Sequence, residues 1–378
     1  MEDVTHFDLA VVGGGPAGSA AAITAARAGA TVVLFERGKL PRHKVCGEFL
    51  SPEAGDLLTA LLAGSTAANY LPSDPHRVKM ARFFLDGHVL HARLKYPATI
   101  LARYDLDAAL WRAATEAKVS ARQQSTVQSI SGIGPFEIRT AQDTVAARAV
   151  VNATGRWSNL AASRDEASAN LKQRNKNGRW IGLKAHFSED NPAPSTDLYF
   201  FDGGYCGVQP VIMVGGSPIE SRVNASAVVR ADIASSLETV FQQNPQLAAR
   251  TRSWSARTES FSTAPIIFRD PEPERDGVLM AGDAGGFVDP FVGDGVSLAL
   301  RTGTLAAQCL LPFIQGDISL PNAAANYREE YASRFLRVFR TSSRLRRMFQ
   351  LPKALRIPVL FALERMPGVV SLLVEKTR

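Results

Sequence analysis

Cysteine is scarce in this chain, which has 3 cysteines among 378 residues. Cys46, Cys206 and Cys309 are too few, and odd in number, to form a disulfide framework. The chain also lacks a basic and apolar leader, because its acidic first residues run directly into an apolar segment. We therefore expect a protein of the reducing cytoplasm, with no signal peptide.

Long hydrophobic runs are missing as well, since no stretch reaches about 18 consecutive apolar residues, the length that a membrane-spanning helix needs. The 6 histidines show no metal-ligand spacing, either among themselves or with cysteine. A Gly-x-Ser-x-Gly elbow and a nucleic-acid-binding motif are absent too. The sequence thus predicts no membrane span, no metal site and no nucleic-acid partner.

What the sequence does contain is a dense motif near its start. An apolar run over 9–12 leads into Gly13-Gly14-Gly15-Pro16-Ala17-Gly18, and an alanine-rich segment then extends to Arg27. A second apolar run over 31–35 ends at Glu36. This order of strand, glycine turn, helix and strand is typical of a dinucleotide-binding unit.

The glycine spacing G-x-G-x-x-G has a physical reason at each position. Gly13 permits the tight turn, Gly15 lets a pyrophosphate approach the backbone, and Gly18 allows the helix and strand to pack closely. The start of the helix offers unpaired N–H groups and the positive end of its dipole to the phosphates. Glu36 has the spacing of an acid that accepts hydrogen bonds from a ribose. The alternative is a glycine-rich turn that binds no nucleotide.

Local patterns predict the elements that follow. Ser51 is expected to cap a helix over 52–63, and Asp86-Gly87 to turn a β-hairpin. Pro352, Pro358 and Pro367 are expected to break the end of the chain into short helices. The other expected segments are a helix over 101–117, a strand over 128–140 paired with one over 144–152, a polar loop over 163–178, strands between 180 and 229, helices over 233–243 and 245–253, a strand over 278–281 and a helix over 296–310.

The end of the chain is basic. Between Arg328 and Arg378, 12 Arg or Lys residues stand against 4 Glu, a net charge of +8 in a chain whose total is +7. This charge forms either a solvated helical face or a surface that touches an acidic partner. The apolar residues of this segment could line a lipid tunnel, lie on a membrane surface or pack against the nucleotide-binding domain, and they are Leu351, Leu355, Ile357, Val359, Leu360, Leu363 and Val369.

Two later segments complete a family pattern. The glycine motif, then Ala153-Thr154-Gly155, then Gly282-Asp283 occur in this order in FAD-dependent oxidoreductases. From about residue 7 to about residue 310, the chain resembles the group that contains para-hydroxybenzoate hydroxylase, flavin-dependent halogenases and geranylgeranyl reductases. The resemblance implies FAD as the cofactor.

The resemblance also implies which residues bind FAD. Arg103 matches an arginine near the FAD phosphate, Asp283 an aspartate on the ribityl chain, and 293–296 a loop and helix start beside the flavin pyrimidine ring. A helix N-terminus at that place would stabilise negative charge on the reduced flavin. The whole implied set is Gly13, Gly15, Pro16, Ala17, Gly18, Glu36, Arg37, Lys44, Cys46, Gly47, Arg103, Thr154, Gly155, Gly282, Asp283, Gly293, Gly295 and Val296.

The implied fold class is α/β. A Rossmann-type FAD-binding domain would be interleaved with an antiparallel β-sheet substrate domain and followed by a C-terminal helical tail. We expect the FAD-binding domain over 1–70, 101–165 and 276–325, the substrate domain over 71–100 and 166–275, and the tail over 326–378.

Four residues are candidates for a catalytic role: Cys46, Tyr205, Gln209 and Pro290. The segment 44–48, Lys-Val-Cys-Gly-Glu, resembles the Lys-x-Cys-Gly segment of geranylgeranyl reductases, which passes close to the flavin. Cys46 is therefore either a wall residue or proton donor at the reaction site, or a buried inert cysteine. Tyr205, Cys206 and Gln209 lie on a strand that resembles the family strand facing the flavin, with a sheet-core role as the alternative, and Pro290 precedes the flavin loop.

The reaction that the resemblance implies first is hydroxylation, by a monooxygenase acting on a phenolic, polyketide or lipid-like small molecule. One alternative is a geranylgeranyl-reductase-like enzyme that reduces carbon–carbon double bonds, and another is a flavoprotein that modifies a carrier- or peptide-bound substrate. The Trp-x-Trp-x-Ile-Pro motif of halogenases and the Tyr-x-Trp-x-Phe-Pro motif of the reductases are both absent.

The partners follow from the single nucleotide fingerprint and from the basic tail. Because there is one fingerprint rather than two, we expect electrons from transiently bound NADPH or NADH, or from a partner reductase. The tail would dock on an acidic carrier protein or touch a membrane peripherally.

Overall fold

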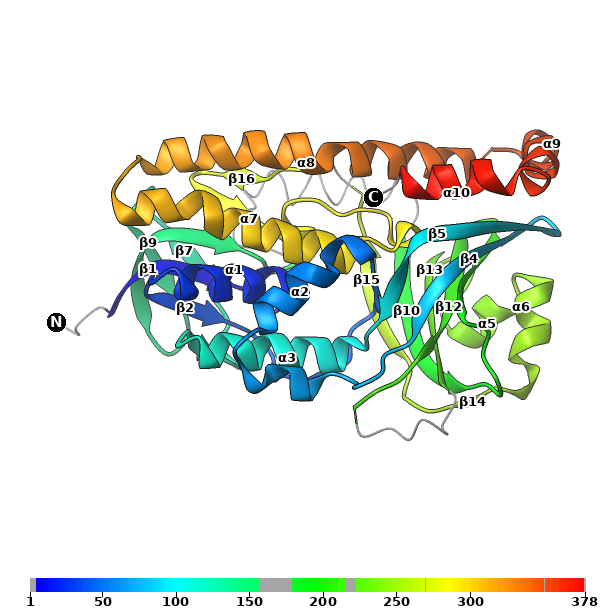
Figure 1. Cartoon of the computed structure of the whole chain (residues 1–378), viewed down its shortest axis with the longest axis horizontal. Helices are drawn as coiled ribbons and strands as arrows, with labels where there is room; N and C mark the ends of the chain where they lie inside the picture. Colours follow the sequence, from blue (N-terminus) through cyan, green and yellow to red (C-terminus); the bar gives the residue numbers. More distant parts are fainter. Residues whose placement is uncertain (1–4, 157–178, 215–221, 269, 350, 377–378) are drawn as a thin grey trace.

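The computed structural model describes residues 5–156, 179–214, 222–268, 270–349 and 351–376. It shows an elongated molecule with one β-sheet toward each end of the long axis and helices along one side of both (Figure 1). The polar loop expected over 163–178 lies outside the described residues.

The first sheet is built mainly from parallel strands in the order β16-β17-β9-β1-β2-β6. The neighbours from β17 to β6 all pair in parallel, so their carboxyl ends meet at one edge. A hairpin of β7 and β8 joins the sheet beside β9. The strands are β1 (Thr5–Val12), β2 (Val32–Phe35), β6 (Ser120–Arg122), β7 (Ser129–Ser131), β8 (Phe136–Arg139), β9 (Thr144–Asn152), β16 (Glu274–Arg275) and β17 (Val278–Met280).

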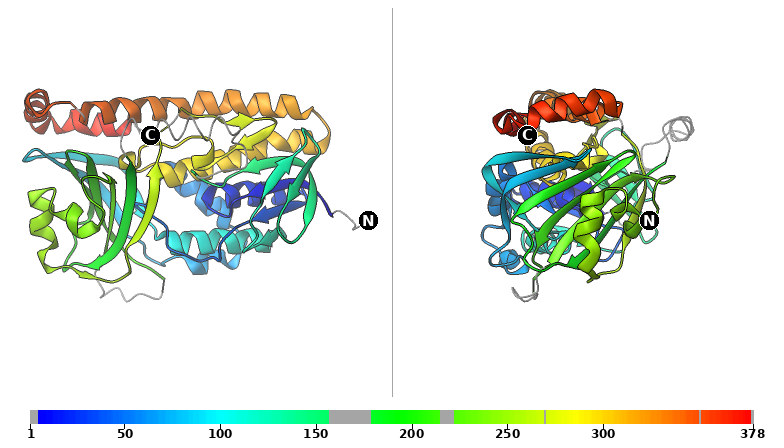
Figure 2. Two further views of the ribbon diagram at one scale, coloured as in Figure 1. Left: turned by 180° about the vertical axis from the view of Figure 1, so that it is seen from behind. Right: turned by 90° about the vertical axis from the view of Figure 1, so that its right-hand side faces the viewer.

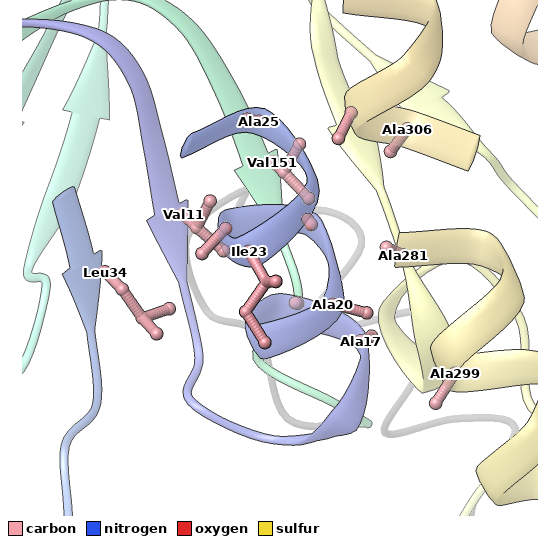
Figure 3. Close-up of a cluster of buried hydrophobic side chains, with 14 of the residues drawn as sticks. Val11, Ala17, Ala20, Ile23, Ala25, Leu34, Val151, Ala281, Ala299 and Ala306 are labelled. Atoms are coloured by element: carbon pink, nitrogen blue, oxygen red, sulfur yellow. The ribbon is translucent and has the colours of Figure 1, made fainter. Parts of the chain in front are cut away.

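Small side chains let the helices approach this sheet closely. Alanines of α1 (Pro16–Arg27) lie between β1 and β9 on one side and alanines of α7 (Gly295–Gln315) on the other (Figure 3). A Cβ atom at Gly303 of α7 would lie 2.0 Å from the carbonyl oxygen of Ala17, so the crossing of these helices requires glycine there. Helices α2 (Gly55–Leu62) and α3 (Arg103–Glu116) pack beside α1.

Helix α7 is also long and apolar enough to cross a membrane. In this structure it lies between α1 and α8 (Leu320–Phe349), where most of its apolar residues are buried. Helices α9 (Lys353–Glu364) and α10 (Pro367–Glu375) are together also long and apolar enough to cross a membrane, but a sharp bend separates them.

The second sheet has the order β14-β10-β13-β12-β11-β4-β5-β3, with β15 paired to β10. Its pairs are antiparallel as expected, except that β4 and β11 run parallel. Helices α5 (Leu237–Phe241) and α6 (Pro245–Arg250) cover one face. The strands are β3 (Phe49–Leu50), β4 (Arg77–Leu85), β5 (His88–Ile100), β10 (Trp180–Ser188), β11 (Ser195–Phe201), β12 (Gly204–Val211), β13 (Arg222–Arg230), β14 (Ser255–Ala256) and β15 (Phe261–Ile266).

The C-terminal helices join the two halves of the molecule. Helix α8 packs on α7 through Tyr327, Tyr331 and Phe335 and runs along both sheets, as the views in Figure 2 show. Helices α9 and α10 then pack against β5 of the second sheet. The expectation that the apolar residues of this segment pack on the nucleotide-binding domain is therefore wrong for α9 and α10.

Three local expectations differ from the structure, and a fourth is confirmed. Ser51 makes no side-chain cap to the short 3-10 turn at 52–54, because its hydroxyl donates to Asp294 Oδ1 at 2.8 Å and contacts Ser297 of α7 instead. Residues 128–140 form the β7–β8 hairpin rather than one strand. Pro358 lies inside α9 without ending it, and α8 is a single helix of 30 residues. The Asp86-Gly87 turn between β4 and β5 is confirmed.

Candidate active site

The glycine motif forms a cradle at the carboxyl edge of the first sheet, between β1 and α1. Gly13 has φ +112°, and a Cβ atom there would lie 2.3 Å from the carbonyl oxygen of Ala153. A Cβ atom at Gly18 would lie 1.9 Å from the carbonyl oxygen of Gly13. Gly15 is the N-cap of α1 and has no side chain that could accept from the amides of Ala17 and Gly18, so these N–H groups stay available to a ligand in the cradle. Pro16 is the first helical residue, a position whose N–H would have no partner within the helix, so proline is tolerated there.

Two cations face the open side of Gly15. A Cβ atom at Gly15 would lie 3.8 Å from Arg103 Nη2 and 3.9 Å from Lys44 Nζ, the two nearest atoms that the described residues place there. Both cations bind the buried Asp107: Arg103 through Nε at 2.8 Å and Nη2 at 2.9 Å, and Lys44 through Nζ at 2.7 Å. Two positive charges and one negative charge leave a net positive charge beside the start of α1, which suits a diphosphate.

Burial affects these charged groups in opposite directions. Burial lowers the pKa of Lys44, and Asp107 opposes that change. Burial raises the pKa of Asp107, but Arg103 and Lys44 outweigh it and hold the pKa below the ordinary value. Asp107 is therefore ionised and fixes both cations at Gly15.

Glu36 lies at the next strand end, after β2, with its carboxylate buried. Its Oε2 accepts from the N–H of Gly14 at 2.9 Å, and its Oε1 accepts from the N–H of Gly38 at 2.8 Å and from Arg42 Nη2 at 3.2 Å. Each carboxylate oxygen can accept further bonds, so a ribose hydroxyl remains a suitable donor. Arg37 is exposed, and it is Arg42 that reaches Glu36.

Strands β9 and β17 bring two more predicted segments to this edge. Thr154 follows β9, and its hydroxyl donates to Asn152 Oδ1 at 2.7 Å, while Gly155 has φ +80° and open space around its Cα. Gly282 follows β17 with φ +61°, and a Cβ atom there would lie 3.0 Å from Ala17 Cβ. Asp283 Oδ2 lies 3.9 Å from Arg156 Nε. The four strand ends thus converge on α1.

The start of α7 closes the far end of the site. Gly293 has φ +76° and lies against Phe49, and Gly295 begins the helix after the buried Asp294. Val296, in the first turn, is buried. Because Ser51 bonds to both Asp294 and Ser297, this helix start is tied to the segment that follows Cys46 and Gly47.

Glu48 joins that segment to the second sheet. Its carboxylate pairs with Lys184 Nζ and, at 2.8 Å, with His186 Nε2, all three side chains being fully buried. It also accepts from the N–H of Arg103 at 3.0 Å, and its φ of +60° is uncommon for a residue other than glycine. Burial raises the pKa of the Glu48 carboxyl, but Lys184 and His186 outweigh it and lower the pKa to about 2. These bonds hold Cys46 and Gly47 between the two sheets.

Cys46 itself is only partly buried. Its Sγ accepts from the N–H of Glu48 at 3.2 Å, and its carbonyl oxygen accepts from Asn224 Nδ2 at 3.0 Å. The structure therefore places Cys46 where the cradle meets the second sheet.

An apolar cleft begins at Gly47 and runs between the second sheet and the C-terminal helices. Its free space is about 1140 Å³, a volume that includes the open mouth. The walls come from β4, β5, β11, β12 and β13, from Pro290 to Gly293, and from α8, α9 and α10; representative residues are Phe83, Leu198, Val228, Leu345, Leu360, Leu363, Val370 and Val374.

Few polar side chains line the cleft, and Gln209 is the one next to Gly47. Gln209 lies 3.8 Å from the Cβ position of Gly47, accepts from Thr196 Oγ1 at 2.7 Å, and has no partner for its Nε2 among the residues that the structure describes. Tyr205 donates its O–H to Asp289 Oδ1 at 3.2 Å. Burial raises the pKa of Asp289 to about 6, although Arg346 opposes that change.

Cys206 lies between Tyr205 and Gln209 but on the opposite face of β12. It is fully buried against α5 and α6, and burial raises the pKa of its thiol to about 12. Side chains on a strand alternate between faces, which separates Cys206 from the cleft.

The residues of the cradle fit FAD. The open glycine N-cap and paired cations match a diphosphate, and Glu36 matches a ribose. Gln209 Nε2, which has no partner among the described residues, lies 3.8 Å from the Cβ position of Gly47. Among the residues that the structure describes, no group of three His, Cys, Asp or Glu residues could hold a metal ion.

Several groups of this site were missed from the sequence. Asp107 and Arg42 carry no motif, although each lies close to a predicted residue. Lys184 and His186 are 136 and 138 residues from Glu48, so only the folded chain brings them together. An i, i+4 spacing of Arg103 and Asp107 was the one available local signal.

Comparisons with known proteins agree on the cofactor class. A family model described as FAD dependent oxidoreductase matches residues 58–308, more than half of the chain, and a second one of the same description matches residues 8–41. A menaquinone reductase of Mycolicibacterium smegmatis is 40% identical over 105 residues, which cover 27% of this chain and 25% of that protein.

Two longer matches have lower identity. Digeranylgeranylglycerophospholipid reductase 2 of Methanopyrus kandleri is 24% identical over 357 residues, covering 91% of this chain and 87% of that protein. The solved structure of the flavin-dependent brominase Bmp2 superimposes with a TM-score of 0.74 at 20% identity, covering 98% of this chain and 94% of the other. The brominase shows the shared fold and no more than the fold.

Proposed function

Because this chain belongs to the FAD-dependent oxidoreductases, we propose that it reduces a carbon–carbon double bond in a lipid-like molecule. The observation that carries the proposal is the apolar cleft, which leads from Gly47 and the start of α7 to the C-terminal helices. A long apolar chain would fill it, with one polar group at the Gln209 end.

FAD, when bound and reduced, supplies the electron pair for this reaction. Its holding residues would be the cradle glycines, Lys44 and Arg103 for the diphosphate, and Glu36 for the ribose. The first amides of α7 would stabilise negative charge near Gly293, as a helix N-terminus does.

The cleft residues would bind and orient the substrate. Apolar walls exclude water from the reacting end, while Gln209 Nε2 would donate a hydrogen bond to an oxygen of the substrate. Tyr205, whose O–H donates to Asp289, and Pro290 also line the cleft. Cys46 would lie beside the cofactor rather than in the cleft, because its Sγ accepts from the N–H of Glu48 and lies beside Arg103.

Two similar proteins support reduction over hydroxylation. They are named for reducing a menaquinone and a digeranylgeranylglycerophospholipid, and both compounds are lipid-soluble. The electron donor that we propose is NADPH, NADH or a partner reductase.

Anaerobic reoxidation tests the proposal. The holoprotein is reduced with dithionite without oxygen, and polyprenyl compounds of graded length are added in detergent. We expect the visible absorbance of oxidised flavin to return and the product to gain two hydrogen atoms. No reoxidation without oxygen, together with an oxygen-dependent product that has gained one oxygen atom, would overturn reduction and establish a monooxygenase.

A further inference from the structure

Helix α9 presents an apolar surface at the end of the molecule. Leu355 is 59% exposed and Phe361 is 51% exposed. We call the exposed apolar residues of this segment the α9 face; they are Leu351, Leu355, Ile357, Val359, Phe361, Met366 and Leu372. A surface helix of a soluble monomer normally turns polar residues to water, so this face needs a partner.

The α9 face carries no exposed charge between the two ends of the helix. Arg356 is the one charged residue between Lys353 and Glu364. It is 6% exposed and turned inward, where its Nε bonds to Asp86 at 2.9 Å and its Nη2 to Asp202 at 3.0 Å. Arg356 thereby anchors the helix to the β4–β5 turn. Between Lys353 and Glu364, the side chains that α9 exposes to solvent are apolar.

Exposed cations stand at both ends of α9 and precede it in the chain. Lys353 begins α9, Arg365 follows its last residue, and Arg344 and Arg347 are exposed near the end of α8. The acidic residues nearby are turned to β5: Glu364 pairs with His88 at 2.8 Å, and Glu375 with Lys95 at 3.7 Å. The result is an apolar surface with a positive border, which is complementary to an anionic lipid surface.

The same helices cover the cleft with their other side. Leu360 and Leu363 of α9 and Val370 and Val374 of α10 line it, opposite the second sheet. The two helices meet at an angle of 104°, so the pair does not form one straight span (Figure 1). A bent apolar pair of this kind suits a position along a membrane surface.

We propose that the α9 face binds an anionic bilayer surface and lets a lipid-like substrate pass from the membrane into the cleft. The inference deepens the proposed function and rests on it only for the identity of the cargo. Apolar residues of α9 lie at the boundary of headgroups and acyl chains, and Lys353, Arg365, Arg344 and Arg347 contact anionic headgroups.

Vesicle sedimentation without substrate tests the membrane contact. The holoprotein is mixed with phosphatidylcholine vesicles that contain or lack phosphatidylglycerol. We expect binding to the anionic vesicles, and at least about tenfold weaker binding to the neutral ones. The double variant Leu355→Glu/Phe361→Glu should bind anionic vesicles at least about tenfold more weakly than the unaltered protein.

The control is Ile133→Glu, which adds a single negative charge at a residue that is 85% exposed beside the first sheet, and the single variant Leu355→Glu is its charge-matched counterpart on α9. Ile133→Glu should bind vesicles like the unaltered protein, and all variants should keep the visible spectrum of bound flavin. Equal binding of the double variant and the control, or no binding of the unaltered protein to either vesicle, overturns the proposal. A dimer in light scattering that only the double variant loses would assign the α9 face to a second copy, and retention on an acidic carrier protein alone would assign it to such a partner.

Vesicle binding needs no turnover, so its outcome is independent of the reoxidation test. Binding without reoxidation would leave the membrane contact standing and reject the reaction. Reoxidation of the flavin without vesicle binding would support the reaction and reject the membrane contact.

Discussion

The cradle of the first sheet and the cleft of the second are built in opposite ways. In the cradle, Gly13, Gly15, Gly18 and Glu36 lie within one short stretch of chain, and each has a defined polar or steric task. The cleft is lined by residues from Gly47 to Val374, and most of them are apolar. In the proposed function, binding of the cofactor would depend on a local motif, whereas binding of the substrate would depend on distant segments that only the fold assembles.

Because the two regions are built separately, substitutions in them should affect FAD binding and substrate use separately. A change in the cradle should remove FAD, and a change in the cleft should leave FAD bound and alter the use of substrate. Four predictions test this difference between cradle and cleft, in order of decreasing expected effect.

Gly18→Ala should have the largest effect. Its Cβ atom would meet the carbonyl oxygen of Gly13 at 1.9 Å, and this oxygen belongs to the backbone, which cannot turn aside as a flexible side chain can. We expect a loss of more than about 3 kcal/mol of unfolding free energy and purification of a colourless protein. Absorbance spectra and thermal unfolding measure the two effects.

Gly55→Ala is the control for this change. Gly55 begins α2 with φ −62°, and no atom lies within 4 Å of its Cβ position. This variant should be yellow and at least as stable as the unaltered protein, because alanine favours helix. Equal behaviour of the two variants would contradict the role given to Gly18.

Lys44→Met should weaken FAD binding without preventing folding. It removes one of the two cations beside Gly15 and leaves Arg103 paired with Asp107. We expect the dissociation constant for FAD to rise by about tenfold or more, measured by fluorescence titration of the apoprotein. Lys39→Met, at an exposed position in the same loop, should leave the constant unchanged.

Gly207→Leu should alter the cleft alone. Gly207 lines the cleft, and its Cβ position is 3.4 Å from Leu198 Cδ2, a flexible side-chain end. The larger side chain would occupy substrate space, so KM for a long polyprenyl substrate should rise by about tenfold while flavin content stays constant. Loss of flavin in this variant would show that cradle and cleft are not separable.

Asp289→Asn should have the smallest effect, on the pH dependence of stability. The pKa of Asp289 is raised from 3.8 to about 6, so the folded state holds its proton more tightly than the unfolded state. The associated stability is full below the unfolded pKa and is lost as pH rises through the folded one. Between pH about 4 and pH about 7, the unaltered protein should lose a few degrees of melting temperature relative to the variant.

Ser297→Ala at α7 is the control for the pH series, because it removes a buried polar group that does not titrate. Its melting temperature should change by the same amount at every pH. A parallel pH dependence of Asp289→Asn and the unaltered protein would reject the titration of Asp289.

The sequence was sufficient where chemistry is local. The glycine motif and the Asp86-Gly87 turn use backbone conformations that few residues tolerate, and both form as expected. The α/β fold class and the FAD-dependent oxidoreductase family are confirmed. The domain boundaries and individual site residues stay predictions.

The sequence was insufficient where partners are distant. Ser51 has the signal of a helix cap, yet its hydroxyl bonds to Asp294, 243 residues away. Nothing in the sequence next to Glu48 predicts its bonds to Lys184 and His186, which are distant in the chain. Pro358 was expected to end a helix, but packing of α9 on β5 holds the helix together. Tertiary contacts outweigh local preference in each case.

A crystal structure of the protein with FAD bound tests the central claim most directly. We predict the diphosphate within hydrogen-bond distance of the first amides of α1 and beside Lys44 and Arg103, with the flavin ring reaching the cleft between Gly47 and Gly293. A ring directed away from the cleft, or FAD bound without contact to Gly15 and Glu36, would contradict the account.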